Sequence, residues 1–163
     1  MHGLYLPTLP KYAKVTITFF LLVIGLTYLV GVVNIYNKTK FTVQGAIENE
    51  RGSEEKMIYA KEFGDLVSVT HTHLGGWAMM FMWVLLFFLF STYSPKLKGV
   101  LGTLPFLLAP LDAASMWLLR YVAPGFAYLL MGVGFLMAAS FGLVLVLDLI
   151  NLWWGKKPVP QSA

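Results

Sequence analysis

Four long apolar runs, separated by polar connections, dominate the pattern of the chain. Each run is long enough to cross a bilayer as a helix, which takes about 20 residues. Only one connection, residues 37–65, is both long and charged. The pattern therefore predicts an all-α integral membrane protein, a four-transmembrane-helix bundle that occupies residues 1–163 as a single membrane domain. The expected spans are residues 15–36, 66–92, 100–121 and 125–154.

The composition indicates the same class. Hydrophobic residues make up 58% of the 163 residues and charged residues only 12%, and the mean hydropathy is +0.70. A soluble domain carries about 25% charged residues. The core of such a chain is the contact between helices within lipid, so the lipid bilayer is its first expected partner.

Several functional classes are excluded by what the sequence lacks. It contains no cysteine, which excludes disulfides, thiolate metal sites, iron–sulfur clusters and a thioether-linked haem. It contains neither a glycine-rich phosphate loop nor a nucleophile elbow. The net charge of +4 is modest and lies at the edges of the apolar runs, so no nucleic-acid partner is expected.

Short basic flanks set the expected orientation. By the positive-inside rule such flanks stay in the cytoplasm, which places both termini inside and residues 37–65 outside, together with the turn at 120–124. The expected location is the inner (cytoplasmic) membrane of a bacterium, crossed several times. The flanking lysines are Lys11 and Lys14, Lys96 and Lys98, and Lys156 and Lys157.

The candidate chemistry begins with two histidines, His71 and His73, at the start of the second apolar run. An ionisable group at membrane depth is costly, so it usually has a partner, a ligand or a functional role. Asp112 lies at a comparable depth in the third run, and Met116 and Arg120 follow it at i+4 and i+8 on one helical face. We therefore expect one site in the outer part of the membrane that combines these residues.

Helical spacing limits what the two histidines can do together. Residues i and i+2 point about 200° apart, so His71 and His73 cannot easily bind one metal ion. Gly75 and Gly76, one turn further on, leave room for a flat cofactor or a close neighbouring helix. An alternative is that the histidines are hydrated interfacial residues bonded to a carbonyl or carboxylate.

For Asp148, near the inner end of the fourth run, we expect hydration at the interface.

Short stretches along the chain carry a resemblance to a known family. They are 41–45 (FTVQG), 50–52 (ERG), 63–66 (FGDL) and 70–74 (THTHL), then 111–112, 117–118, 125–127 and 152–154. Through them the chain resembles an uncharacterised family of small four-helix bacterial inner-membrane proteins that accompany multihaem cytochrome and respiratory genes. The similarity extends from about residue 25 to residue 154. It implies a subunit in an electron-transfer setting, with His71 and His73 at the family's histidine positions.

Two hypotheses for the function stay open. In the first, the chain is a subunit that binds haem b near the outer face, with His73 or His71 as an axial ligand of the iron. Asp112 and Arg120 would lie next to that histidine without touching the iron. Its second axial ligand would be Met116, or a histidine of a second copy or a partner. In the second hypothesis, the chain is a cofactor-free accessory subunit that anchors a respiratory complex and lines a quinone site.

Both hypotheses predict an electron-transfer or non-catalytic subunit of an oxidoreductase rather than an enzyme that works alone. The expected partners are the other subunits of a respiratory complex. Among them is a periplasmic-side cytochrome c, which would dock on the outer segment. An ion or proton transporter is a weaker alternative, because four spans with one acid offer no evident continuous path.

Overall fold

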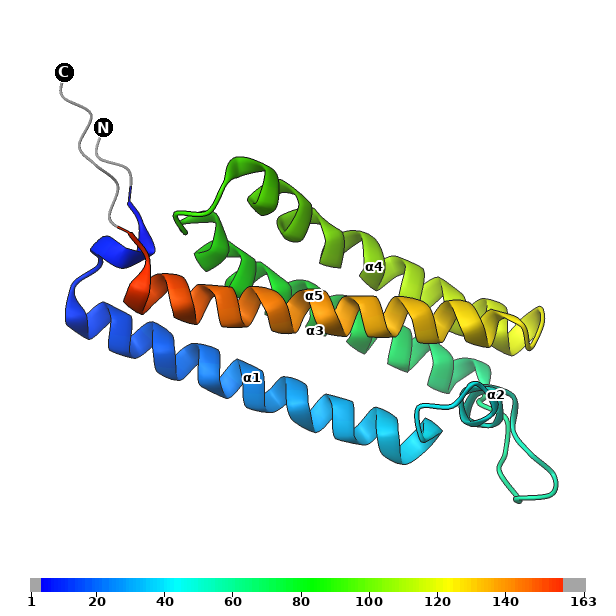
Figure 1. Cartoon of the computed structure of the whole chain (residues 1–163). Coiled ribbons are helices and arrows are strands. Elements are labelled where there is room, and N and C mark those ends of the chain that lie inside the picture. Colours follow the sequence, from blue (N-terminus) through cyan, green and yellow to red (C-terminus); the bar gives the residue numbers. More distant parts are fainter. Residues whose placement is uncertain (1–3, 157–163) are drawn as a thin grey trace.

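The computed structural model describes residues 4–156 and contains, over that range, five α-helices and no strand (Figure 1). Four of the helices are long and apolar enough to cross a membrane. The predicted all-α fold with four spans is therefore confirmed. Lys157, one of the expected flanking lysines, lies outside the described residues. After a 3₁₀ turn at Leu6–Thr8 come α1 (Lys11–Thr39), α2 (Val43–Arg51), α3 (Phe63–Leu89), α4 (Pro95–Tyr121) and α5 (Phe126–Trp154).

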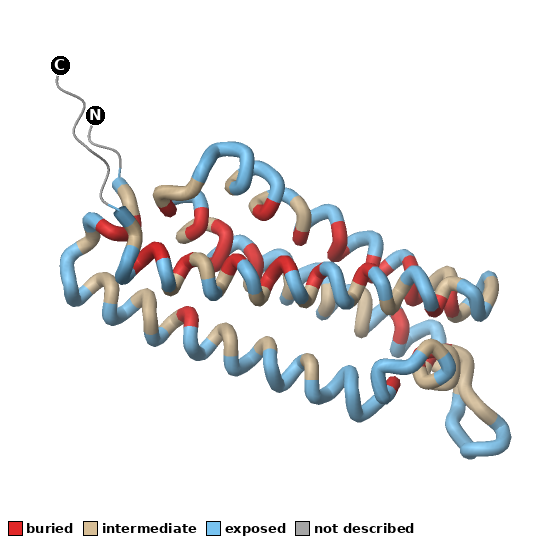
Figure 2. Tube along the Cα trace, in the orientation of Figure 1, coloured by how far each residue is buried: buried red, intermediate tan, exposed pale blue. Residues whose placement is uncertain are grey.

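The long helices run side by side, and α2 lies across one end of the bundle (Figure 1). The start of α1, the end of α5 and the α3–α4 connection lie at the opposite end. α4 is the most enclosed span: 44% of its most apolar stretch is buried, compared with 6% for α1. Figure 2 shows the buried positions on α3, α4 and α5 facing one another, while α1 is mostly exposed. α1 therefore offers most of its surface to lipid or to another chain.

The core forms from large side chains on the facing sides of α3 and α5. Phe81 and Phe141 are fully buried and their ring centroids lie 5.3 Å apart. α1 joins this core through Tyr28, whose ring lies 4.9 Å from that of Phe141. It also approaches α5 at Gly25, where an added Cβ would lie 3.4 Å from a Leu145 methyl group. Small residues allow such approaches between membrane helices.

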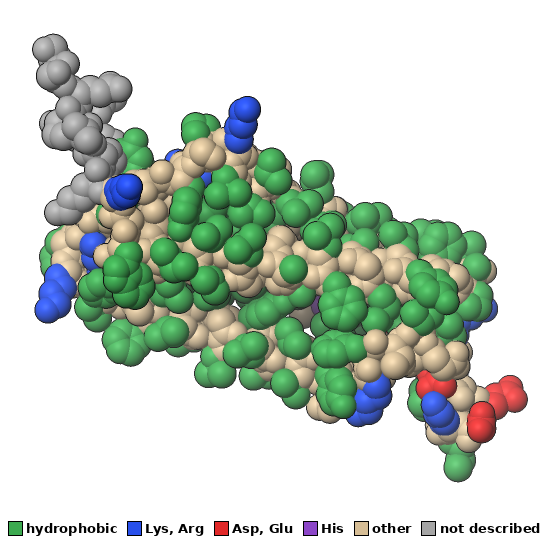
Figure 3. All heavy atoms as spheres, viewed as in Figure 1, with side chains coloured by type: hydrophobic (Ala, Val, Ile, Leu, Met, Phe, Trp, Pro, Cys, Tyr) green, Lys and Arg blue, Asp and Glu red, His purple; other side chains and the backbone are tan. Residues whose placement is uncertain are grey.

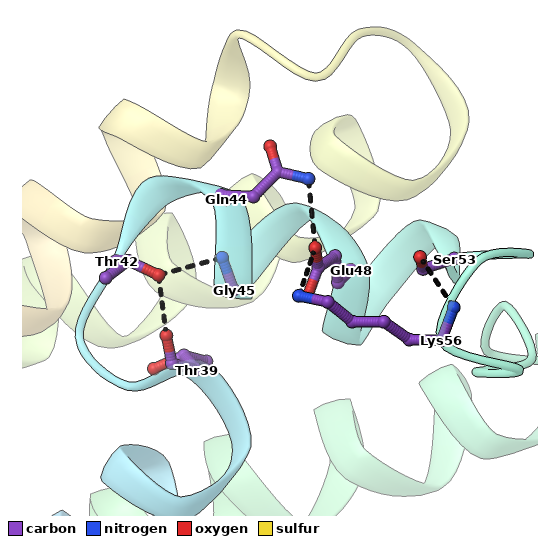
Figure 4. Close-up of polar contacts among 7 residues, drawn as sticks. All are labelled: Thr39, Thr42, Gln44, Gly45, Glu48, Ser53 and Lys56. Atoms are coloured by element: carbon purple, nitrogen blue, oxygen red, sulfur yellow. Dashed lines mark hydrogen bonds and ion pairs between the residues drawn. The ribbon is translucent and has the colours of Figure 1, made fainter.

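Residues 37–65, which we call the outer segment after its expected orientation, contain a helix that the apolar pattern does not predict. The end of the bundle beside this segment is called the outer end in the same sense, and the opposite end the inner end. α2 is short and polar, and it forms within residues 37–65, which we expected only to connect two spans. Its first turn is capped by Thr42, whose hydroxyl accepts a 3.0 Å hydrogen bond from the Gly45 N–H (Figure 4). It ends at Gly52, whose φ of +83° favours glycine. α1 and α3 also extend into this segment, to Thr39 and from Phe63.

Candidate functional site

An imidazole and a carboxylate from neighbouring spans meet in the bundle. The Nδ1 atom of His73 on α3 lies 3.7 Å from Oδ2 of Asp112 on α4. His73 is ten residues from the start of α3 and Asp112 nine from the end of α4. These counts place both residues roughly 14–15 Å from the outer ends of their helices. The structure thus brings together two residues that the sequence placed at one depth.

The two nitrogens of His73 differ in their surroundings. Nδ1 is buried and makes no hydrogen bond within the described residues, and its nearest charged group is Asp112. The His73 side chain as a whole is 38% exposed, so the remainder of the ring reaches the surface of the bundle. When one ring nitrogen faces a carboxylate, the other is left to bind a ligand. Nε2 of His73 is the atom of this site that can do so.

Asp112 is buried where three helices converge. On the α5 side it faces Gly134, where an added Cβ would lie 3.9 Å from Oδ1 of Asp112. On its own helix, the Ser115 hydroxyl donates a 2.7 Å hydrogen bond to the Asp112 carbonyl. A buried carboxylate without a countercharge is costly in a membrane. His73 is the side chain that can supply that charge, because it becomes cationic on accepting a proton.

Aromatic side chains border the pair. On the inner side, the Trp77 ring lies 6.5 Å from the His73 ring in an edge-to-face arrangement. Trp77 in turn contacts Tyr28 of α1 and Phe81 of α3. On the outer side, the Trp117 indole donates a 2.8 Å hydrogen bond to the Thr70 hydroxyl, which joins α4 to α3. The pair therefore lies between two contacts that hold its helices in place.

The other predicted site residues lie elsewhere. His71 is exposed and lies on a different face of α3 from His73, as the helical spacing predicts. Met116 is buried in an apolar cluster with Leu66 and Ala113. Arg120 donates from Nε to the Lys61 carbonyl at 2.8 Å, so it serves the outer segment and lies two turns from Asp112.

Gly75 and Gly76, one turn beyond the histidines, make no close contact with a neighbouring helix. An added Cβ at Gly75 or Gly76 would meet nothing within 4 Å, and both residues are exposed. The room expected there is present, but on the outer surface of α3. No group of three or more His, Cys, Asp or Glu side chains that could hold a metal ion occurs in residues 4–156.

Asp148 differs from its expected environment. We expected it to be hydrated at the inner interface, but the structure buries it completely, so that expectation is wrong. Neither carboxylate oxygen has a hydrogen-bond partner within the described residues. The sequence contained a signal for this position, because Asp148 shares helical spacing with the buried residues Phe141, Val144 and Leu152.

A cavity of about 630 Å³ lies near Asp148 at the inner end of the bundle. Beside it, Asn151 accepts from the Thr92 N–H at 3.1 Å and donates to the Thr92 hydroxyl at 2.8 Å. Burial, together with the nearby Asp148 carboxylate, raises the pKa of Tyr93. Sequence reasoning did not find this polar group. The lining residues are Tyr5, Ser91, Thr92, Tyr93, Pro95, Lys98, Ile150, Asn151, Trp154, Gly155 and Lys156.

Comparison with known proteins agrees with this architecture. A family model described as a transmembrane helical domain matches residues 40–159, which include α2 to α5 and thus both partners of the His73–Asp112 contact. No curated protein and no solved structure matches the chain significantly.

Proposed function

We propose that this chain, which belongs to the family of transmembrane helical domains described above, is the membrane subunit of a bacterial respiratory electron-transfer complex. In this proposal the His73–Asp112 pair binds the head group of a quinone in the outer half of the inner membrane. The resemblance to proteins that accompany multihaem cytochrome genes supports the respiratory setting. The geometry of the His73–Asp112 pair supports a quinone as the ligand.

The orientation of His73 is the observation that carries the proposal. With Nδ1 held 3.7 Å from the Asp112 carboxylate, Nε2 is left to accept a hydrogen bond from a quinol hydroxyl. Asp112 stabilises the positive charge that the imidazole gains when it accepts a proton. The pair can thus bind a quinol and receive one of its protons. The electrons must pass to a redox centre in another subunit.

Access from the bilayer favours a quinone. Quinones diffuse within the membrane, so their site must open sideways to lipid rather than to water. His73 is partly exposed, and α1 is the least enclosed span, with only 6% of its most apolar stretch buried. In Figure 3 the surface between α1 and α5 is hollowed at mid-length, and a histidine is visible there. A head group could enter along this gap while its tail remains in lipid.

Haem b is the second candidate ligand, and one observation favours it. Histidines that bind metals usually direct their other ring nitrogen to a carboxylate or carbonyl, as His73 does toward Asp112. The described residues fit one axial ligand only, because His71 faces elsewhere and Met116 packs with Leu66. The second ligand would come from another chain. When bound, haem would supply one-electron transfer, and Asp112 would orient the ring of His73.

Two measurements on the purified chain in nanodiscs test these candidates. Short-chain benzoquinone and naphthoquinone are titrated while tryptophan fluorescence is recorded, since Trp77 adjoins His73. His73→Ala should weaken binding at least about tenfold, the usual effect of losing a well-placed hydrogen bond to a ligand. His71→Ala is the matched control and should bind as the wild type does. Equal binding by all three proteins would contradict the quinone proposal.

A visible absorption spectrum decides the haem candidate. Bound haem gives Soret and alpha bands, which His73→Ala should remove while the protein still inserts. His71→Ala should leave them in place, because His71 faces away from His73. Asp112→Asn should keep the haem but weaken its retention, by about 10–100-fold for a residue that orients a ligand. Bands that survive both histidine substitutions would rule out the axial-ligand role.

A further inference from the structure

The connection between α2 and α3 forms a turn that projects from the outer end of the bundle (Figure 1). We call residues 52–62 the outer hairpin. Ser53 and Ile58 exchange two backbone hydrogen bonds of 2.9 Å, which close the turn. Met57, within the turn that this bridge closes, is 87% exposed, and Tyr59, directly after the bridge, is 93% exposed. Large apolar side chains with this exposure, outside the spans, are typical of a binding surface.

The outer hairpin is fastened to the end of α4. Arg51, at its base, donates from Nη1 to the carbonyls of Leu119 and Arg120 at 3.0 and 3.3 Å. Arg120 returns a bond from Nε to the Lys61 carbonyl at 2.8 Å. The Lys61 ammonium also forms a buried ion pair with Glu50. The exposed side chains are therefore presented from a braced position, which lowers the entropy lost when a partner binds.

Two lysines of the outer hairpin, Lys56 and Lys61, have their charges paired, whereas Arg51 and Arg120 at its base bond to carbonyls and keep theirs. Lys56 donates to both carboxylate oxygens of Glu48 at 2.8 Å, and Gln44 donates to one of them at 3.1 Å (Figure 4). The hydrogen bonds from Lys56 and Gln44 hold the pKa of Glu48 below its ordinary value. Glu48 therefore stays ionised at neutral pH and cancels the charge of Lys56. Lys61 is likewise neutralised by Glu50.

The acids around the tip are not neutralised in this way. Glu54, Glu55, Glu62 and Asp65 are all exposed, and none forms an ion pair within residues 4–156. In the view of Figure 3, acidic side chains gather at this end of the molecule and are not visible over the spans. The outer hairpin is thus an apolar tip with a negative rim.

We propose that the outer hairpin is the docking site for a protein whose surface presents an apolar patch ringed by lysine and arginine. The partner's role as an electron carrier rests on the proposed function, whereas the docking itself rests on the exposure and charge of the outer hairpin. The negative rim disfavours anionic lipid head groups, which would repel it. It also disfavours a second copy in tip-to-tip contact, because a two-fold interface would place like charges together.

Binding of a basic soluble c-type cytochrome to the full chain in zwitterionic nanodiscs tests this proposal. The wild type should bind at low ionic strength and lose affinity as salt is added. The double substitution Glu54→Lys with Glu55→Lys should weaken binding at least tenfold. Met57→Ala with Tyr59→Ala should also weaken it about tenfold, as for an interface hot spot, and leave the salt dependence unchanged. Tyr12→Ala, at a tyrosine of α1 that is 77% exposed and lies at the opposite end of the bundle, is the control and should have no effect.

Three results would overturn the proposal. The first is no binding at low ionic strength, and the second is unchanged binding by both double variants. The third is equal affinity for lysozyme, which is basic but not an electron carrier and would indicate charge attraction alone. His73→Ala should leave docking intact, so loss of docking and loss of the quinone site are separate outcomes.

The lipid alternative is tested with a spin label. Because the chain contains no cysteine, Met57→Cys gives a single labelling site. A water-soluble relaxation agent should reach the label in the nanodisc, and the bound cytochrome should protect it. A label that is relaxed by oxygen dissolved in the bilayer, and not by the water-soluble agent, would place the tip in lipid and contradict the docking proposal.

Discussion

Trp117 on α4 donates its indole N–H to the hydroxyl of Thr70 on α3 at 2.8 Å, about one turn outward of the contact between His73 and Asp112. This is a bond between side chains of two different spans. It fixes how far α3 is shifted along α4. The level at which His73 meets Asp112 depends on that shift, so the bond supports the site without belonging to it.

Removing this bond should therefore weaken both the bundle and the site. Trp117→Phe and Thr70→Val should each lower the free energy of unfolding, and a double-mutant cycle should assign about 0.6 kcal/mol to the pair, the average for such bonds in membranes. Unfolding of each variant in mixed detergent measures these free energies. Trp153→Phe, which removes a bond from α5 to Thr18 on α1, is the control and should leave quinone affinity unchanged. A coupling energy of zero would mean that the register is set by other contacts.

For Asp148 we expect a substitution to raise the free energy of unfolding rather than lower it. Its carboxylate oxygens are buried without partners in the described residues, so an apolar side chain of similar size should suit the isolated chain better. Asp148→Leu should raise the free energy of unfolding by about 1–3 kcal/mol, the usual cost of an unsatisfied buried polar group. Asp112→Leu is the comparison and should give no such gain, because Asp112 faces His73. Destabilisation by Asp148→Leu would show that the carboxylate has a stabilising partner.

Arg51 should matter for the outer end of the bundle. Its guanidinium donates to two carbonyls at the end of α4, so Arg51→Ala leaves them without these donors. We expect a loss of about 1.5–3 kcal/mol, as for hydrogen bonds to a charged group, and faster proteolysis within residues 52–62. Lys56→Ala breaks only an exposed ion pair and should cost less. The outer hairpin is not braced by Arg51 if its cleavage rate stays the same.

The orientation in the membrane is tested with reporter fusions. Fusions after Lys98 and after Lys157 should report the cytoplasm, because basic flanks stay inside. A fusion within residues 47–56 should report the outside. A cytoplasmic signal from that fusion would invert the topology. It would place the His73–Asp112 pair in the inner half of the membrane and expose the outer hairpin to the cytoplasm.

The spans could be predicted from the sequence because membrane length and the cost of unpaired backbone groups leave helices as the simplest solution. The depth of His73 and Asp112 followed from counting residues along two antiparallel helices. α2 was missed because its nine residues carry no long apolar run. Arg120 was grouped with Asp112 by spacing alone, yet it turns to the Lys61 carbonyl, since a long side chain reaches contacts outside its own face.

The central claim is that Nε2 of His73 binds a redox group in the membrane, and pulsed EPR tests it most directly. The chain has three histidines, so ¹⁵N-histidine labelling marks few sites. With a semiquinone generated in the nanodisc-bound protein, we expect a hyperfine coupling to one imidazole nitrogen that His73→Ala removes and His71→Ala keeps. A semiquinone without any histidine nitrogen coupling, in protein that also shows no haem signal, would contradict the claim.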